Sequence, residues 1–200
     1  MTIVECNSEY FLALFYLVFI TTFKQIEQDD MIGKRVTFND AESPYIVKQY
    51  ITSGSFGKIY LGLHEFTGQR VAIKMERQDS PNRQLYLEFG FYMKLGKNAY
   101  TPEIFTLGRC GNFYALVMAM LGPSLNDLFN KCKHDSRGFR QRCVAALGYK
   151  LTQIFEYVHK KGLIYRDVKP QNFLVGPSES EYAYNVYMIG KCLQCSIGEQ

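Results

Sequence analysis

Residues 163–175 read LIYRDVKPQNFLV and carry the most specific pattern in the sequence. It has apolar residues at both ends and a polar middle that carries Arg166, Asp167, Lys169 and Asn172. A carboxylate, an ammonium and a carboxamide in one short loop can accept a hydroxyl proton, neutralise a phosphate and supply an oxygen ligand to Mg²⁺. These residues match the pattern H-R-D-x-K-x-x-N, with Tyr165 in place of its histidine. This match and the apolar flanks together predict a phosphoryl-transfer loop rather than a chance agreement.

A glycine-rich hairpin lies upstream of this loop. Residues 45–51 and 59–63 have strand patterns on either side of the turn TSGSFG. Gly54 and Gly57 allow the backbone to approach a phosphate closely, while Thr52 stands where the G-x-G-x-x-G pattern has its first glycine. By itself such a hairpin is usually only a turn, so its weight comes from the lysine and the polar loop downstream of it.

The lysine lies on a third strand, residues 71–75, which reads VAIKM. The ammonium of Lys74 can reach the α- and β-phosphates of a nucleotide, and Glu88 in a predicted helix over residues 85–95 is the acidic group available to hold it. Alone, Lys74 would be an ordinary surface lysine. Its position between the hairpin and the polar loop favours the nucleotide site.

The rest of the pattern places strands first and helices later, which predicts an α+β fold of two lobes divided near Leu121. Two more strands are expected at residues 104–107 and 113–118, and a last strand at 185–189. Ser124 is expected to cap a short helix with Leu125, Leu128 and Phe129 on its buried side. A long helix is predicted from apolar residues at helical spacing, namely Val144, Leu147, Leu151, Ile154, Phe155 and Val158.

These motifs resemble the casein kinase 1 family of serine/threonine protein kinases over residues 44–189. The matching segments are SGSFG (53–57), IYLG (59–62), LGPSL (121–125), EYVH (156–159) and NFL (172–174). The segments LIYRDVKP (163–170) and LEFGFY (87–92) most resemble its gamma-type, membrane-associated branch. The resemblance implies a bilobal protein-kinase fold, ATP and Mg²⁺ as cofactors, and serine or threonine in protein substrates.

The resemblance also assigns roles. Asp167 and Lys169 would be catalytic and Asn172 a metal ligand, while residues 116–121 would be the hinge that binds adenine, with Met118 as gatekeeper. Ala119 replaces the usual glutamate of that hinge, which weakens one contact. The implied nucleotide-binding residues are Ser53, Gly54, Ser55, Phe56, Gly57, Ile59, Ala72, Lys74, Glu88, Met118, Met120, Leu121 and Leu174.

The resemblance fails abruptly at position 190. Gly190 stands where the family has the metal-binding aspartate of Asp-Phe-Gly, and the residues after it no longer resemble the family. The expectation is a complete small lobe and a truncated large lobe, for which a frameshift, retained intron or lost exon is a better account than an evolved short kinase. The alternatives to an active enzyme are a catalytically inactive nucleotide-binding or interaction module and a fragment without function.

Composition adds boundaries and exclusions. With 47% hydrophobic residues and a net charge of +4, the chain is neither disordered nor a nucleic-acid binder, and its six cysteines are expected to be reduced thiols.

Residues 1–43 form an extension whose apolar run, Tyr10 to Ile20, is too short to span a bilayer. Residues 44–120 form a small lobe of five strands and one helix, 121–189 begin the large lobe, and 190–200 are a divergent tail. A cytoplasmic monomer acting on acidic or phospho-primed proteins is expected, with membrane-associated or nuclear location as alternatives.

Overall fold

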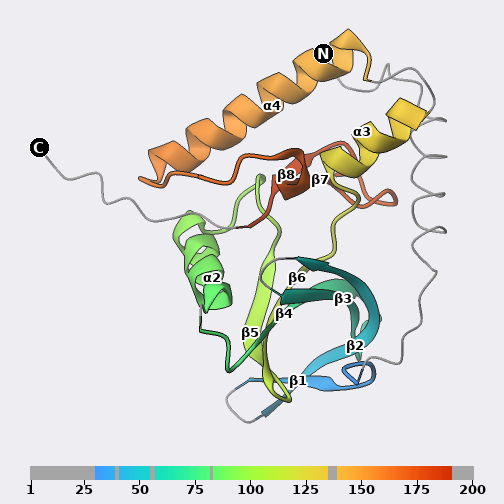
Figure 1. The fold of residues 1–200 in the computed structure, drawn as a ribbon, viewed down its shortest axis with the longest axis vertical. Helices are drawn as coiled ribbons and strands as arrows, with labels where there is room; N and C mark the ends of the chain where they lie inside the picture. The colour runs from blue at the N-terminus through green and yellow to red at the C-terminus, as the bar shows by residue number, and fades with distance from the viewer. Residues whose placement is uncertain (1–29, 39–40, 55–56, 82, 135–138, 191–200) are drawn as a thin grey trace, which may run out of the picture. The chain divides into compact units, whose positions relative to one another are not determined.

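The computed structural model describes residues 30–38, 41–54, 57–81, 83–134 and 139–190 (Figure 1). They fall into two compact units. The small unit lies within Lys24–Lys97 and Pro102–Met120, and the large unit within Asn98–Thr101 and Leu121–Gln200. The apolar run at residues 10–20 and the tail at 191–200 lie outside the described residues. No helix in the described ranges is both long and apolar enough to cross a membrane.

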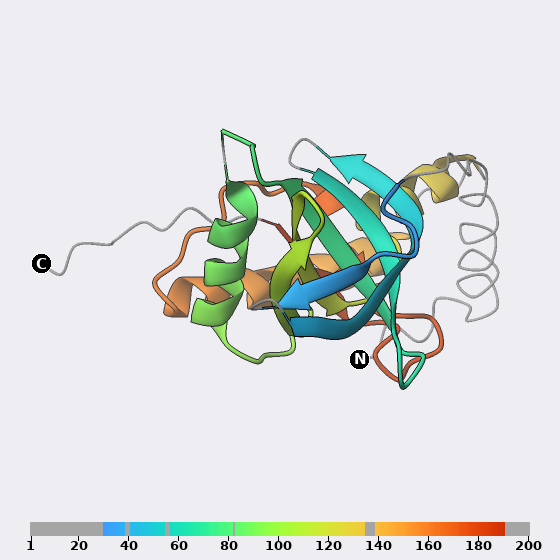
Figure 2. The same ribbon diagram turned by 90° about the horizontal axis from the view of Figure 1, so that it is seen from below.

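The small unit is a closed barrel of antiparallel strands in the order β1-β2-β3-β4-β6-β5, visible from below in Figure 2. The strands are β1 (Arg35–Phe38), β2 (Ala41–Gly54), β3 (Gly57–His64), β4 (Arg70–Arg77), β5 (Ile104–Cys110) and β6 (Phe113–Ala119). The strands from β2 to β6 cover the segments that the sequence predicted. β1 was not predicted, so the sheet has six strands where the sequence indicated five.

Side chains along β4 point alternately into the core of the barrel and to the opposite, functional face, which carries Lys74. Val71, Ile73 and Met75 are buried in the hydrophobic core, together with Val36 of β1. Side chains at successive strand positions point to opposite faces, so Lys74 and its neighbours two residues away share the other face. The strand pattern therefore fixes which side of the barrel can carry a charged site.

Helix α2 (Gln84–Leu95) packs on the small unit and matches the predicted helix. Its buried residues are Leu85, Glu88, Phe91, Tyr92 and Leu95. Helical spacing in the sequence predicts that Phe89 lies near the face of Leu85, Tyr92 and Leu95, but Phe89 is only half-buried and Phe91 is buried instead. The helix is rotated so that Glu88 faces inward, one turn from Leu85 and from Phe91.

The large unit begins with α3 (Leu125–His134), whose cap is the one predicted. The Asp127 amide donates to Ser124 Oγ over 3.1 Å, and the Ser124 hydroxyl and amide donate to Asp127 Oδ2 over 2.6 and 3.0 Å. Leu125 and Leu128 are buried as expected. Phe129 is 46% exposed, contrary to prediction, and its ring instead makes an edge contact with Phe139.

Helix α4 (Gln141–Lys160) contains the predicted apolar stripe, but only Ile154 and Val158 are buried among its residues. Near its start Val144 is 54% exposed. The sequence also predicted the strand that becomes β8 (Val186–Met188); its partner β7 (Phe173–Val175) had been expected only as the apolar end of the loop. Between α4 and β7, the single-turn 3-10 helix η2 (Pro170–Asn172) ends the polar loop.

Candidate active-site residues

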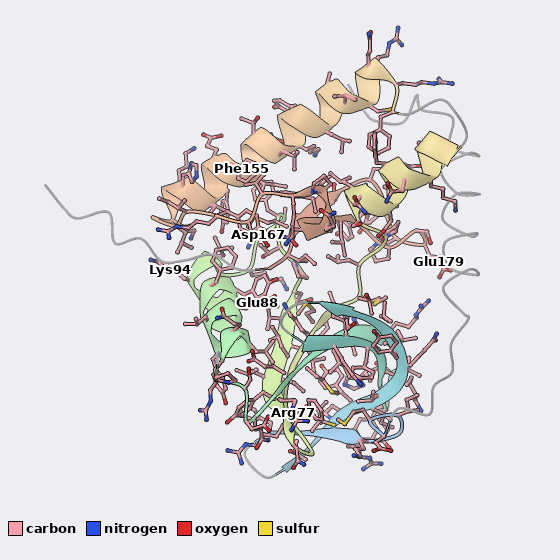
Figure 3. The ribbon with its side chains drawn as sticks, in the orientation of Figure 1. Arg77, Glu88, Lys94, Phe155, Asp167 and Glu179 are labelled. Carbon is pink, nitrogen blue, oxygen red and sulfur yellow. The ribbon has the colours of Figure 1, made fainter. Side chains whose placement is uncertain are left out.

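Lys74 and Glu88 form the ion pair that the sequence predicted. Lys74 Nζ lies 2.5 Å from Glu88 Oε2, and the hydroxyl of Tyr92 donates to Glu88 Oε1 over 3.3 Å. The side chain of Glu88 is 2% exposed, while that of Lys74 is 19% exposed. A carboxylate that is buried and doubly hydrogen-bonded fixes the ammonium of Lys74 in one place without covering it. Figure 3 marks Glu88 on α2.

The predicted nucleotide-binding residues of the barrel share one face of the sheet. Ile59 of β3 is paired directly with Lys74 of β4, and Ala72 of β4 is paired with Met118 of β6. Directly paired residues point to the same side of a sheet, and so do residues two apart in one strand. An apolar strip therefore borders the ammonium of Lys74.

The glycine hairpin joins β2 and β3 at the pair Gly54–Gly57. Ser53 pairs with Lys58 next to it, while Ser55 and Phe56 lie outside the described residues. The two glycines differ in their surroundings. A Cβ on Gly57 would lie 2.0 Å from the carbonyl oxygen of Met75, whereas a Cβ on Gly54 would meet nothing within 4 Å. Gly57 is thus required by the fold, and Gly54 leaves its side of the hairpin open.

In the large unit the polar loop brings its predicted residues together around one carboxylate. Lys169 Nζ lies 2.7 Å from Asp167 Oδ2, and Asn172 Nδ2 donates to the same oxygen over 2.9 Å and to the Asp167 carbonyl over 2.8 Å. The side chains of Asp167 and Lys169 are 49% and 45% exposed. Asp167 is therefore held by two donors yet stays accessible, as a group that must meet a substrate hydroxyl requires. Asp167 is labelled in Figure 3.

Position 190 lies beside this loop. The hydroxyl of Tyr165 donates to the Ile189 carbonyl over 2.7 Å, and the Ile189 amide donates to the Asn172 carbonyl over 2.9 Å. Gly190 has φ +97°, and a Cβ there would lie 3.7 Å from the amide nitrogen of Asn172. A carboxylate at this position would thus stand next to the predicted metal ligand, and the chain has none there.

The donor set does not fit a resident Mg²⁺. This ion takes carboxylate and phosphate oxygens in an octahedral shell, whereas the residues here offer the amide of Asn172 and no side chain at Gly190. The carboxylate of Asp167 is already bound by Lys169. In the described part of the chain no three His, Cys, Asp or Glu side chains cluster as a metal site would need. Lys74, which the sequence predicted to contact phosphates, is in contrast present and paired with Glu88.

The remaining predicted residues lie where the chain passes from β6 to α3 and on β7. Met120 and Leu121 are half-buried, and Leu174 forms an isolated bridge with Ser124. The Ala119 amide donates to the Glu103 carbonyl over 2.8 Å. The Ala119 amide is therefore already hydrogen-bonded within the small unit.

Sequence reasoning missed one charged residue on the functional face. Glu76 lies two positions after Lys74 in β4 and is buried, and its carboxylate contacts the start of α2. One signal could have found it, namely the period of two in β4, which places Glu76 on the same face as Lys74.

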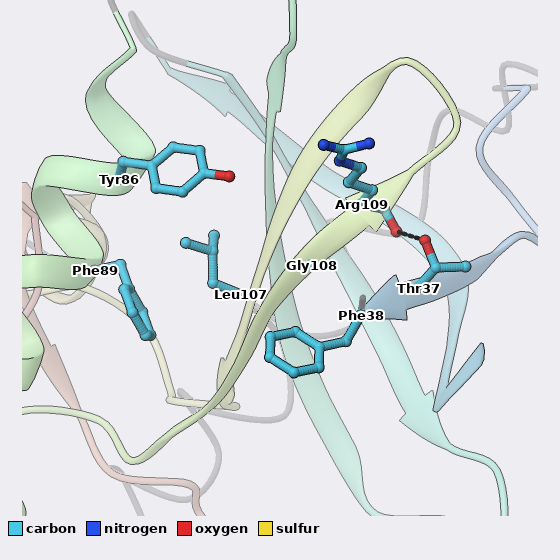
Figure 4. Close-up of a pocket in the computed structure, with 7 residues that line it drawn as sticks. All are labelled: Thr37, Phe38, Tyr86, Phe89, Leu107, Gly108 and Arg109. Carbon is cyan, nitrogen blue, oxygen red and sulfur yellow. Dashed lines mark hydrogen bonds between the residues drawn. The ribbon is translucent and has the colours of Figure 1, made fainter. Parts of the chain in front are cut away.

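A pocket of about 450 Å³ lies elsewhere on the small unit, between β1, α2 and β5 (Figure 4). Its lining includes Phe38, Tyr86, Phe89 and Leu107, with the Thr37 hydroxyl bonded to the Arg109 carbonyl over 3.2 Å at one side. None of the predicted nucleotide-binding residues is among its lining residues. The pocket is thus separate from the Lys74 site.

Comparison with protein families agrees with these arrangements. The family described as the protein kinase domain matches residues 45–184, a span that holds the glycine hairpin, the Lys74–Glu88 pair and the whole polar loop. The match covers well over half of the 200 residues. The chain, with its α+β kinase-like fold, belongs to the protein kinase family.

Proposed function

We propose that this chain binds ATP and is of the casein kinase 1 type, a serine/threonine protein kinase by family. The observation that carries the proposal is the ion pair between Lys74 and the buried Glu88. An ammonium fixed on a sheet face between apolar side chains suits the α- and β-phosphates, and the strip formed by Ile59, Ala72 and Met118 suits an adenine ring.

The loop of the large unit supports the kinase assignment. In an active kinase of this type Asp167 would accept or orient the proton of the substrate hydroxyl, and Lys169 would neutralise charge on the γ-phosphate. The substrates would be acidic or phospho-primed proteins, because the resemblance to casein kinase 1 implies that preference. Mg²⁺ would be held by Asn172 together with a carboxylate that this chain lacks at Gly190.

A catalytically inactive nucleotide-binding or interaction module is the second candidate, and Gly190 favours it. Without a carboxylate beside Asn172, the charge that develops on the transferred phosphoryl group is left uncompensated. Purified protein incubated with ATP, Mg²⁺ and casein should therefore show turnover far below the ~1–100 s⁻¹ usual for kinases. Turnover in that range would exclude the inactive module.

Titration calorimetry with ATP tests the nucleotide site itself. Lys74→Met should weaken ATP binding at least about tenfold, because an ion pair with phosphate is lost. Lys97→Met is the control, since Lys97 is 86% exposed and its ion pair is with the exposed Glu103. Equal ATP affinity in both variants, or no binding by the unaltered protein, would refute the proposal.

A further inference from the structure

Glu76 is a buried carboxylate that ties strand β4 to helix α2. It is 3% exposed, and its two oxygens accept from the amides of Gln84 over 2.9 Å and Leu85 over 3.0 Å. These are the first two residues of α2. Glu76 therefore caps the helix from a strand and not from the helix's own sequence.

Among the described residues at its start, helix α2 shows no local substitute for this cap. Arg83 occupies the capping position without a side-chain hydrogen bond, and the first turn contains no acidic residue. The free amides at a helix start need acceptors, and the partial positive charge there favours an anion. The carboxylate of Glu76 meets both needs at once.

Glu76 and Lys74 attach α2 to the same strand at two points. They lie two residues apart in β4, roughly 6.6 Å along the strand, and Leu85 and Glu88 lie roughly 4.5 Å apart along the helix axis. At one point the strand supplies the cation and the helix the carboxylate; at the other the strand supplies the carboxylate and the helix its positive end. Two attachments fix the rotation of α2, which a single ion pair cannot do.

We infer that Glu76 is a positioning residue of the nucleotide site: by capping α2 it keeps Glu88 on Lys74, and so keeps the Lys74 ammonium in place for phosphate. The inference rests on the proposed function for its consequence in ATP binding. The geometry of the two attachments is independent of that function. The positioning of Lys74 and its consequence for ATP binding can therefore be tested separately.

The first test measures Lys74 directly. In Glu76→Gln the amide can accept from only one of the two helix amides, because its NH₂ group is a donor. Amide exchange at Gln84 and Leu85 should quicken, and an amine-reactive ester should label Lys74 about threefold faster, because the hold of Glu88 on the ammonium loosens. Glu103→Gln, a matched change at an exposed carboxylate, should alter neither rate.

A second variant removes one bond from the helix side. Gln84→Pro deletes the amide that donates to Glu76 but suits the first position of a helix, so α2 can still form. It should raise Lys74 labelling in the same direction as Glu76→Gln and to a smaller extent. If Glu76→Gln fails to fold, this variant decides: unchanged Lys74 labelling in Gln84→Pro overturns the inference.

A double-mutant cycle on ATP affinity separates positioning from general stability. Glu76→Gln should weaken ATP binding about three- to tenfold, and Glu88→Gln should weaken it at least as much. If Glu76 acts through Glu88, the double variant should bind ATP as weakly as Glu88→Gln alone. Losses that simply add would overturn the inference. If the unaltered protein binds no ATP, the proposed function fails, and the exchange and labelling results still decide the role of Glu76.

Discussion

The Tyr165 hydroxyl donates a hydrogen bond to the Ile189 carbonyl, joining the polar loop to the segment that leads to position 190. The Ile189 amide returns a bond to Asn172 in the same loop. Tyr165 stands where the resembled catalytic loop has histidine, and its phenol reaches the backbone of the residue before Gly190. These two hydrogen bonds connect the loop to the end of β8.

Tyr165→Phe should loosen this connection. Losing this part-buried neutral hydrogen bond should cost about 1 kcal/mol, so amide exchange at Ile189 should become about fivefold faster. Tyr149→Phe is the control, because the Tyr149 hydroxyl accepts from the exposed Gln153 side chain and the tyrosine is 66% exposed. Unchanged exchange at Ile189 in Tyr165→Phe would mean that the Tyr165 hydrogen bond does not help to hold the end of β8.

Gly190→Asp should create a magnesium-dependent increase in ATP affinity of about tenfold, because the new carboxylate would stand next to Asn172. The positive φ at this position strains any side chain, and aspartate tolerates it better than most. Gly190→Asn carries the same strain without the charge. ATP titrations with and without MgCl₂ would contradict the expectation if the two variants behaved alike.

Gly57→Ala and Gly54→Ala should separate the structural from the functional glycine. The first forces a methyl group against the Met75 carbonyl and should destabilise the barrel by about 1–3 kcal/mol. The second meets open space and should leave the melting temperature nearly unchanged while weakening ATP binding. A melting temperature lowered equally in both, measured by circular dichroism, would refute this division.

Helix α4 should show an accessible apolar surface. An apolar dye should bind the protein, and amide exchange should be faster across residues 139–189 than across 44–120. Val144→Lys should reduce dye binding without loss of stability, whereas Ile154→Ala, at a site that is 1% exposed, should cost about 2–5 kcal/mol. Uniformly slow exchange in a soluble monomer would show that the α4 surface is covered.

Cys110 should resist thiol reagents more than Cys132 and Cys143. Burial raises the pKa of the Cys110 thiol, and nearby Lys34 only partly offsets this, so the reactive thiolate remains scarce at pH 8. Cys132 and Cys143 are only half-buried, and neither is in a disulfide. Iodoacetamide labelling with detection by mass spectrometry at pH 8 should therefore modify Cys110 last; labelling at equal rates would contradict its burial.

The sequence predicted those features that depend on local pattern. The pairing of Lys74 with Glu88 was inferred from a strand and a helix in order, and the Ser124 cap from a serine before an apolar run. The cap on α2 escaped notice because its acceptor, Glu76, lies on a strand and meets the helix only after folding. A propensity rule for helix starts examines only neighbours in sequence, so it cannot find an acceptor that lies on another element.

Two further differences also have tertiary causes. Phe89 and Phe129 were assigned to buried faces because apolar spacing permits several rotations of a short helix about its axis. Tertiary packing selects a different rotation in each case. The four residues of β1 are too few to show alternation, and they become a strand because β2 and β5 supply hydrogen-bonding partners. The geometry around Gly190 likewise could not be read from spacing, since it depends on where β8 returns to the loop.

Strand β1 has a practical consequence for anyone dividing this protein. The kinase-domain match begins at residue 45, yet Arg35–Phe38 pairs with β2 on one side and with Arg109 of β5 on the other. A fragment begun at residue 45 would leave β2 and β5 with unpaired amides and carbonyls. Exposed strand edges of this kind promote intermolecular strand addition and aggregation. It would also remove Val36 from the core, so a soluble small unit should be cut before residue 30.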